Sequence, residues 1–163
     1  MSIADDMVAA AASRRDELAA LGLGLRPRRK LAVLTCMDAR IDPAAIFGLA
    51  PGDAHIIRNA GGLVTDDALR SLSVSQRRMS TEEIVVVMHD GCGLHGASAD
   101  AFAEELAAEG VAPSWPLGAF ADLETTLRDG LALLRSSPEL RARDRIRGFI
   151  FNPETGALRE VFE

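Results

Sequence analysis

Apolar and polar positions alternate along the chain in blocks whose spacing predicts strands and helices in turn. Five short apolar runs predict strands, at 31–35, 54–57, 83–88, 147–151 and 158–161. The run at 84–87 is the strongest strand signal, because all of its residues are β-branched. Apolar runs that do not alternate with polar residues suit a parallel sheet that is covered on both faces.

Apolar residues spaced three and four positions apart predict helices around these strands. The helices are expected at 4–21, in a short stretch from 43, at 65–79, at 98–109, and from 117 or 121 to 134. Thr65 suits the N-cap of the third helix, and Asp66 and Asp67 are favourably placed in its first turn. Asp42 followed by Pro43 is a similar start signal for the second helix.

This order of elements predicts an α/β fold, a single domain with a central, mostly parallel β-sheet flanked by helices and an N-terminal helical arm. The length of 163 residues suits one such domain. We expect residues 1–30 to form the arm and a linker, and residues 31–163 to form the α/β domain. The arm packs either on a partner subunit or on its own domain, and the sequence leaves both arrangements open.

Charge and composition narrow the class of protein. The formal net charge is −6, which argues against a nucleic-acid partner, since such proteins are usually basic. We find no apolar stretch of 18 residues, and therefore expect no membrane span. The N-terminus also lacks a basic segment followed by an apolar one, so we expect a cytoplasmic protein rather than an exported one.

Two motifs carry the candidate chemistry, and each lies at the end of an expected strand. The first is Cys-x-Asp-x-Arg at 36–40, and the second is His-x-x-Cys-Gly at 89–93. In open α/β sheets, functional sites gather at the carboxyl ends of the strands. The chain has two cysteines in all, one in each motif.

The residue types in these motifs indicate a zinc site. A catalytic zinc ion takes three protein ligands, commonly thiolate and imidazole, and keeps one open position. Cys36, His89 and Cys92 can supply those three ligands. Two other interpretations stay open, namely buried cysteines that act as small apolar residues and a closed, non-catalytic zinc site in which Asp38 is a permanent fourth ligand. A dithiol switch is disfavoured, because it prefers Cys-x-x-Cys spacing.

With the segment Arg-Asn-Ala-Gly at 58–61 between the two motifs, the chain resembles the β-class carbonic anhydrase family, in its short bacterial type. The resemblance implies one Zn²⁺ per chain, held by Cys36, His89 and Cys92. It implies that Asp38 accepts a hydrogen bond from zinc-bound hydroxide, or ligates zinc in a closed form. Arg40 would pair with Asp38 and draw it off the metal.

The resemblance also implies the cleft residues, the reaction and the partners. Asn59, Ala60 and Gly61 would line the substrate cleft. The reaction would be the reversible hydration of carbon dioxide to bicarbonate and a proton. A carbonyl sulfide or carbon disulfide hydrolase on the same scaffold is the alternative. The family is built from dimers, so we expect a homodimer or a higher homo-oligomer. His95 is either a proton shuttle or an ordinary loop histidine.

Overall fold

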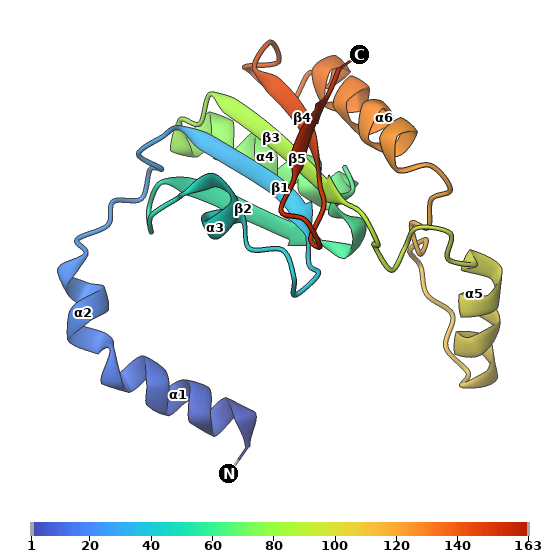
Figure 1. Cartoon of the computed structure of the whole chain (residues 1–163), viewed down its shortest axis with the longest axis horizontal. Helices are drawn as coiled ribbons and strands as arrows, with labels where there is room; N and C mark the ends of the chain where they lie inside the picture. The colour runs from blue at the N-terminus through green and yellow to red at the C-terminus, as the bar shows by residue number, and fades with distance from the viewer. Residues whose placement is uncertain (1, 163) are drawn as a thin grey trace.

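The computed structural model describes residues 2–162, which form one sheet flanked by helices (Figure 1). Within that range the sheet has five strands in the order β2-β1-β3-β4-β5. Their bounds are β1 Leu31–Cys36, β2 Ala54–Asn59, β3 Glu83–His89, β4 Ile146–Phe151 and β5 Leu158–Val161. β2, β1, β3 and β4 are parallel, and β5 returns antiparallel to β4. The predicted α/β class with a mostly parallel sheet is confirmed.

The helices in residues 2–162 are mostly those that the spacing predicts. They are α1 Ile3–Ser13, α2 Arg15–Ala20, α3 Pro43–Phe47, α4 Asp66–Met79, α5 Ala99–Ala108 and α6 Leu123–Ser136. The expected caps are present, since the Thr65 side chain accepts from the N–H of Ala68 and the Asp42 side chain accepts from the N–H of Ala44. These caps explain why both helices begin where the sequence predicts.

One core lies between the sheet and two of these helices. Alternate residues of the central strands, among them Leu34, Val86 and Ile150, are buried together with Leu72 of α4 and Leu131 of α6. Val33 of β1 and Val87 of β3, which point to the other face, are buried as well, so burial on both faces explains the continuous apolar runs of these strands. This packing fixes the sheet on which the two motifs sit.

Three expectations about element bounds are wrong. The helix at 4–21 is two helices, because the backbone at Arg14 leaves helical geometry. β2 continues through Asn59, two residues beyond the expected strand at 54–57. The last helix begins only at Leu123, where the side chain of Asp122 accepts from the N–H of Thr125.

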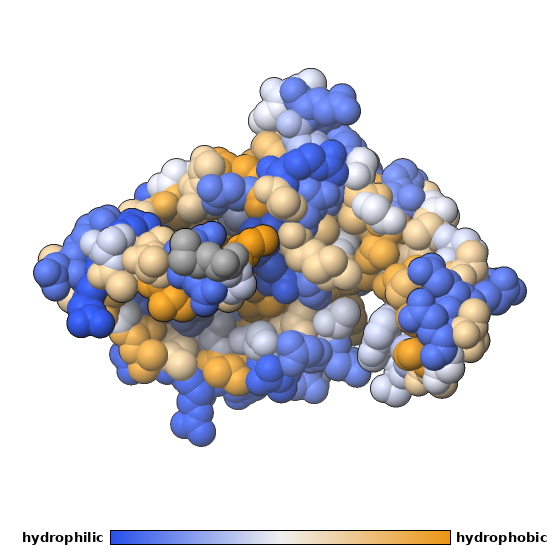
Figure 2. Space-filling view, turned by 90° about the horizontal axis from the view of Figure 1, so that it is seen from below, coloured by the Kyte–Doolittle hydropathy of each residue, from blue (hydrophilic) through white to orange (hydrophobic). Residues whose placement is uncertain are grey.

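The N-terminal arm does not cover its own domain. No residue of α1 or α2 is buried, and the arm extends away from the sheet (Figure 1). α5 also projects from the sheet and has no buried residue. Viewed from below, the surface of the molecule carries hydrophobic residues between hydrophilic ones (Figure 2). No helix in residues 2–162 has the length and hydropathy needed to cross a membrane.

Candidate metal centre

Neighbouring strands bring the two motifs together at one edge of the sheet. Cys36 is the last residue of β1 and His89 is the last residue of β3, and these strands pair in parallel. Cys92 follows within a turn in which Gly91 has a φ of +65°, a backbone conformation that glycine adopts readily. The ligand atoms of the three residues lie within 4.8 Å of one another, and all three residues are buried.

The imidazole of His89 presents one nitrogen to this cluster. Its Nδ1 lies 3.0 Å from the carbonyl oxygen of Asp90, which is the distance of a hydrogen bond donated by Nδ1–H. That tautomer leaves a lone pair on Nε2, which is buried and has no hydrogen-bond partner among the described residues. Because a buried nitrogen without a partner is costly, this atom fits a metal ligand.

The two thiols can supply negative charge to a divalent cation once they lose their protons. Burial raises the pKa of the Cys92 thiol, and the neighbouring Cys36 raises it further. A cation held between the sulfur atoms reverses this penalty, because it stabilises both thiolates. Thiolate and imidazole donors in this number fit zinc with one open position.

A carboxylate and a guanidinium border the three ligands. Arg40 donates from Nη2 to Asp38 Oδ2 over 2.7 Å and from Nε to Asp38 Oδ1 over 3.0 Å. These bonds hold the pKa of the Asp38 carboxyl well below its usual range, so it is ionised at neutral pH. Arg40 Nη2 also donates to the carbonyl oxygen of Gly91 over 2.9 Å, and thereby connects the first motif to the second.

The expected cleft segment forms a tight turn beside this site. The Asn59 amide donates to the carbonyl oxygen of Leu63 and accepts from the Leu63 N–H, at 2.8 and 2.9 Å. Its side chain therefore closes the turn through Ala60 and Gly61. Ala60 is exposed, whereas Gly61 is buried.

Two residues of this region were missed as site residues. Arg58 donates to the carbonyl oxygens of Cys36 and Asp38, at 3.0 and 2.7 Å. Gly62 packs so closely on β1 and β3 that an added Cβ would lie 2.9 Å from the nitrogen of Cys36. The Arg-Asn-Ala-Gly segment contains Arg58 and is the sequence signal for it. No sequence pattern indicates that the backbone at Gly62 lies so close to β1 and β3.

His95 is anchored just after the second motif. Its Nε2 lies 3.0 Å from the carbonyl oxygen of Ala121, and its ring stacks on Phe120 with centroids 5.6 Å apart. The backbone reinforces this contact, because Phe120 N–H donates to the carbonyl oxygen of Leu94. In this conformation His95 joins the segment after Cys92 to the segment before α6.

Fold and site together define an α/β enzyme with a group of two cysteines and a histidine that is able to hold a zinc ion. A sequence model of the family described as carbonic anhydrase matches residues 31–137. The chain is 38% identical over 140 residues to β-carbonic anhydrase 1 of Mycobacterium tuberculosis (strain ATCC 25618 / H37Rv), which covers 85% of this chain and 86% of the relative. The chain therefore belongs to the β-carbonic anhydrase family.

Two further comparisons extend this likeness. A crystal structure of carbonic anhydrase from Streptococcus mutans matches with a TM-score of 0.91 and 40% identity, over 99% of both chains. Its likeness thus includes the arm as well as the α/β domain. Carbon disulfide hydrolase of Acidianus sp. (strain A1-3) is 34% identical over 163 residues, covering 84% of this chain and 79% of the relative.

Proposed function

We infer that this chain catalyses the zinc-dependent, reversible hydration of carbon dioxide to bicarbonate and a proton. The observation that carries this function is the buried, unpartnered Nε2 of His89 beside two buried thiols. Family membership supports the same reaction. The zinc ligands we propose are Cys36, His89 and Cys92, one ion per chain.

Zinc held by these side chains would supply a Lewis acid that brings the pKa of a water molecule to about 7. The residues around it would then orient the reactants. Because Arg40 keeps the Asp38 carboxylate ionised, that carboxylate can only accept hydrogen bonds. We propose that Asp38 accepts one from the attacking water and so fixes which lone pair faces the carbon of carbon dioxide.

We propose that Asn59, Ala60 and Gly61 border the substrate through their backbone. The side-chain amide of Asn59 is hydrogen-bonded to the backbone of Leu63, so this side chain stabilises the turn rather than contacting the substrate. A rigid turn at this place keeps the cleft preorganised for a small, uncharged substrate.

Stopped-flow measurement of carbon dioxide hydration tests the function. Zinc-loaded protein should be active at pH about 7 and about 8.5, and the Cys92→Ser variant should be inactive at both. Carbon disulfide serves as a second substrate in the same experiment, with sulfide release as the readout. Hydrolysis of carbon disulfide without hydration of carbon dioxide, by protein shown to hold zinc, would replace the proposed reaction.

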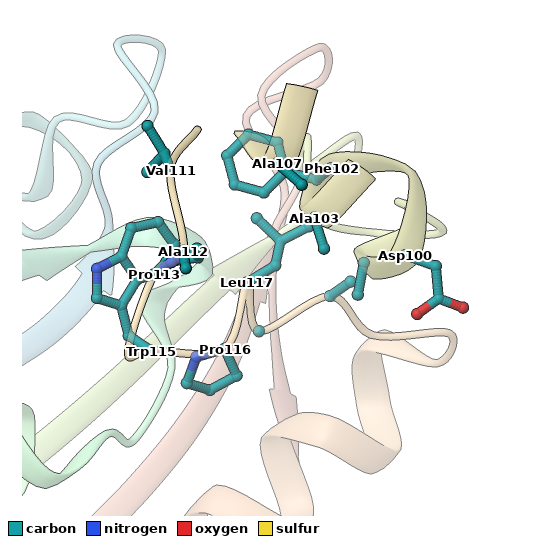
Figure 3. A pocket seen from close by; sticks show the side chains of 13 residues that line it. Asp100, Phe102, Ala103, Ala107, Val111, Ala112, Pro113, Trp115, Pro116 and Leu117 are labelled. Atoms are coloured by element: carbon teal, nitrogen blue, oxygen red, sulfur yellow. The ribbon is translucent and has the colours of Figure 1, made fainter. Parts of the chain in front are cut away.

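We also propose that the chain forms a homodimer through its projecting parts. Ile3, Met7 and Val8 of the arm are 80%, 67% and 70% exposed, which is unusual for side chains of this kind on a helix. An apolar groove of about 650 Å³ lies between α5 and residues 111–119, with Phe102, Leu117 and Trp115 around it (Figure 3). A second copy of the chain would cover these apolar surfaces.

Light scattering tests the dimer, since the expected mass is twice 17.4 kDa. The double change Met7→Asp and Val8→Asp should lower the mass toward that of the monomer. The double change Ala9→Asp and Ser13→Asp is the matched control, because it places the same added charge on the opposite side of α1. A monomer for the unchanged chain would contradict the proposal.

Finally, we propose that residues 1–30 act as the dimer arm and residues 31–163 as the catalytic domain, in the cytoplasm. A reducing compartment keeps Cys36 and Cys92 available as thiolate ligands. Cell fractionation tests the location, and a protein found outside the cytoplasm would contradict it.

A further inference from the structure

Arg58 connects β2 to the backbone that carries two of the site residues. It is the residue before the end of β2, and it pairs in register with Thr35 of β1. Its Nε donates to the carbonyl oxygen of Cys36 over 3.0 Å, and its Nη2 donates to the carbonyl oxygen of Asp38 over 2.7 Å. One guanidinium therefore spans the peptide segment between the thiol and the carboxylate.

This segment has few other restraints. β1 ends at Cys36, and the bond from Met37 N–H to the carbonyl oxygen of Asn59 is the last one it makes to β2. Beyond it, the Asp38 N–H donates to Sγ of Cys36 over 3.4 Å, and the Asp38 carbonyl oxygen accepts from the N–H of Ile41 over 3.0 Å. Since the backbone leaves the sheet here, its course depends on these few bonds.

We propose that Arg58 is a positioning residue of the metal centre. It fixes the backbone between Cys36 and Asp38, so that the thiol and the carboxylate keep their spacing relative to His89. Arg40 has a different task, because it holds the carboxylate itself and the carbonyl oxygen of Gly91. The planar fork of Arg58 suits its task, since it presents two fixed donors, whereas the ammonium of lysine is a point charge on a flexible stem.

Three variants test this role, namely Arg58→Ala, Arg58→Lys and the control Arg70→Ala. Arg70 is an exposed arginine of α4 whose guanidinium binds the Asp67 carboxylate, so its removal deletes a hydrogen-bonded arginine that makes no bond to the first motif. Each variant is loaded with Co²⁺ for its visible spectrum and with Zn²⁺ for kcat and KM. Circular dichroism and the melting temperature report folding.

We expect Arg58→Ala to change the cobalt spectrum and to lower metal affinity or kcat by about 10- to 100-fold, as loss of a residue that orients a ligand commonly does. KM should change less than kcat, because Arg58 acts on the site rather than on the substrate. Arg58→Lys should recover part of the loss, and Arg70→Ala should match the unchanged chain.

An unchanged cobalt spectrum and unchanged kcat in folded Arg58→Ala would overturn the inference. If Arg58→Ala fails to fold, Arg58→Lys decides instead, and a spectrum identical to that of the unchanged chain would overturn it. The kinetic part rests on the proposed function. Should the unchanged chain prove inactive toward carbon dioxide, that function fails, while the cobalt spectra still decide the role of Arg58.

Discussion

The Oδ2 atom of Asp38 lies 3.8 Å from Nε2 of His89, the nitrogen that faces the three-ligand cluster. The same oxygen accepts a 2.7 Å hydrogen bond from Arg40. The carboxylate thus lies beside the proposed metal position, and a guanidinium pairs with its charge. This arrangement favours an open site, because a carboxylate engaged by arginine is less free to become a fourth ligand.

The first prediction concerns Arg40. The variant Arg40→Gln loses the charged fork, so Asp38 is freed to approach the metal. We expect kcat for carbon dioxide hydration to fall by about 10- to 100-fold while the zinc content stays near one per chain. Stopped-flow kinetics and metal analysis check both values. Undiminished activity would show that Arg40 is not needed to keep the Asp38 carboxylate off the metal.

The second prediction concerns removal of the metal. Without a cation, the buried Nε2 of His89 has no partner and the two thiols are penalised by burial. Zinc at 100 times its dissociation constant should therefore add about 2.7 kcal/mol to the free energy of unfolding, by mass action. Thermal melts of chelated and zinc-loaded protein measure this. The Cys92→Ser variant should show little of the rise, and an equal rise there would place the stabilising zinc elsewhere.

The third prediction concerns Gly62, which has a φ of +68°. A Cβ at this position would lie 2.9 Å from Cys36 N and 3.1 Å from Val87 O. Gly62→Ala should therefore lower the free energy of unfolding by about 2 kcal/mol or more, from strain and overpacking together.

Gly156→Ala is the control for that change. Gly156 has a φ of +72°, but an added Cβ there would have nothing within 4 Å. The control thus isolates the cost of the backbone conformation, and denaturant unfolding compares the two variants. Equal losses would mean that the close approach of Gly62 to β1 and β3 has no cost of its own.

The fourth prediction concerns His55 and pH. Its Nδ1 lies 2.7 Å from Oγ of Ser75, whose Oγ in turn lies 2.8 Å from Oγ1 of Thr81. Burial lowers the pKa of His55 below its usual value of 6.5. The unfolded chain consequently binds more protons than the folded one as the pH falls through about 6.5, and stability falls with it.

Urea unfolding at pH about 7.5 and about 5.5 measures this effect. The variant His55→Gln keeps a hydrogen-bonding side chain but cannot titrate. Its loss of stability over this pH range should be smaller than that of the unchanged chain. The same loss in both proteins would assign the pH dependence to other groups.

Local chemistry made much of the fold predictable. The β-branched residues at 84–87 indicated β3, and the caps Asp42 and Thr65 indicated where α3 and α4 begin. The limits of β2 were less predictable, because Arg58 and Asn59 are polar residues that continue the strand beyond its apolar run. The break in the arm at Arg14 has no signal in the apolar spacing of 4–21.

The sequence by itself determined the donor types of the site, because Cys36, His89 and Cys92 each follow or end an apolar strand and suit zinc. Only the tertiary structure decided that β1 lies next to β3, which brings these donors within 4.8 Å of one another. It also decided that Arg58 reaches back from β2 to the first motif. Such contacts depend on strand order and register, which are set by packing of the whole core rather than by neighbouring residues.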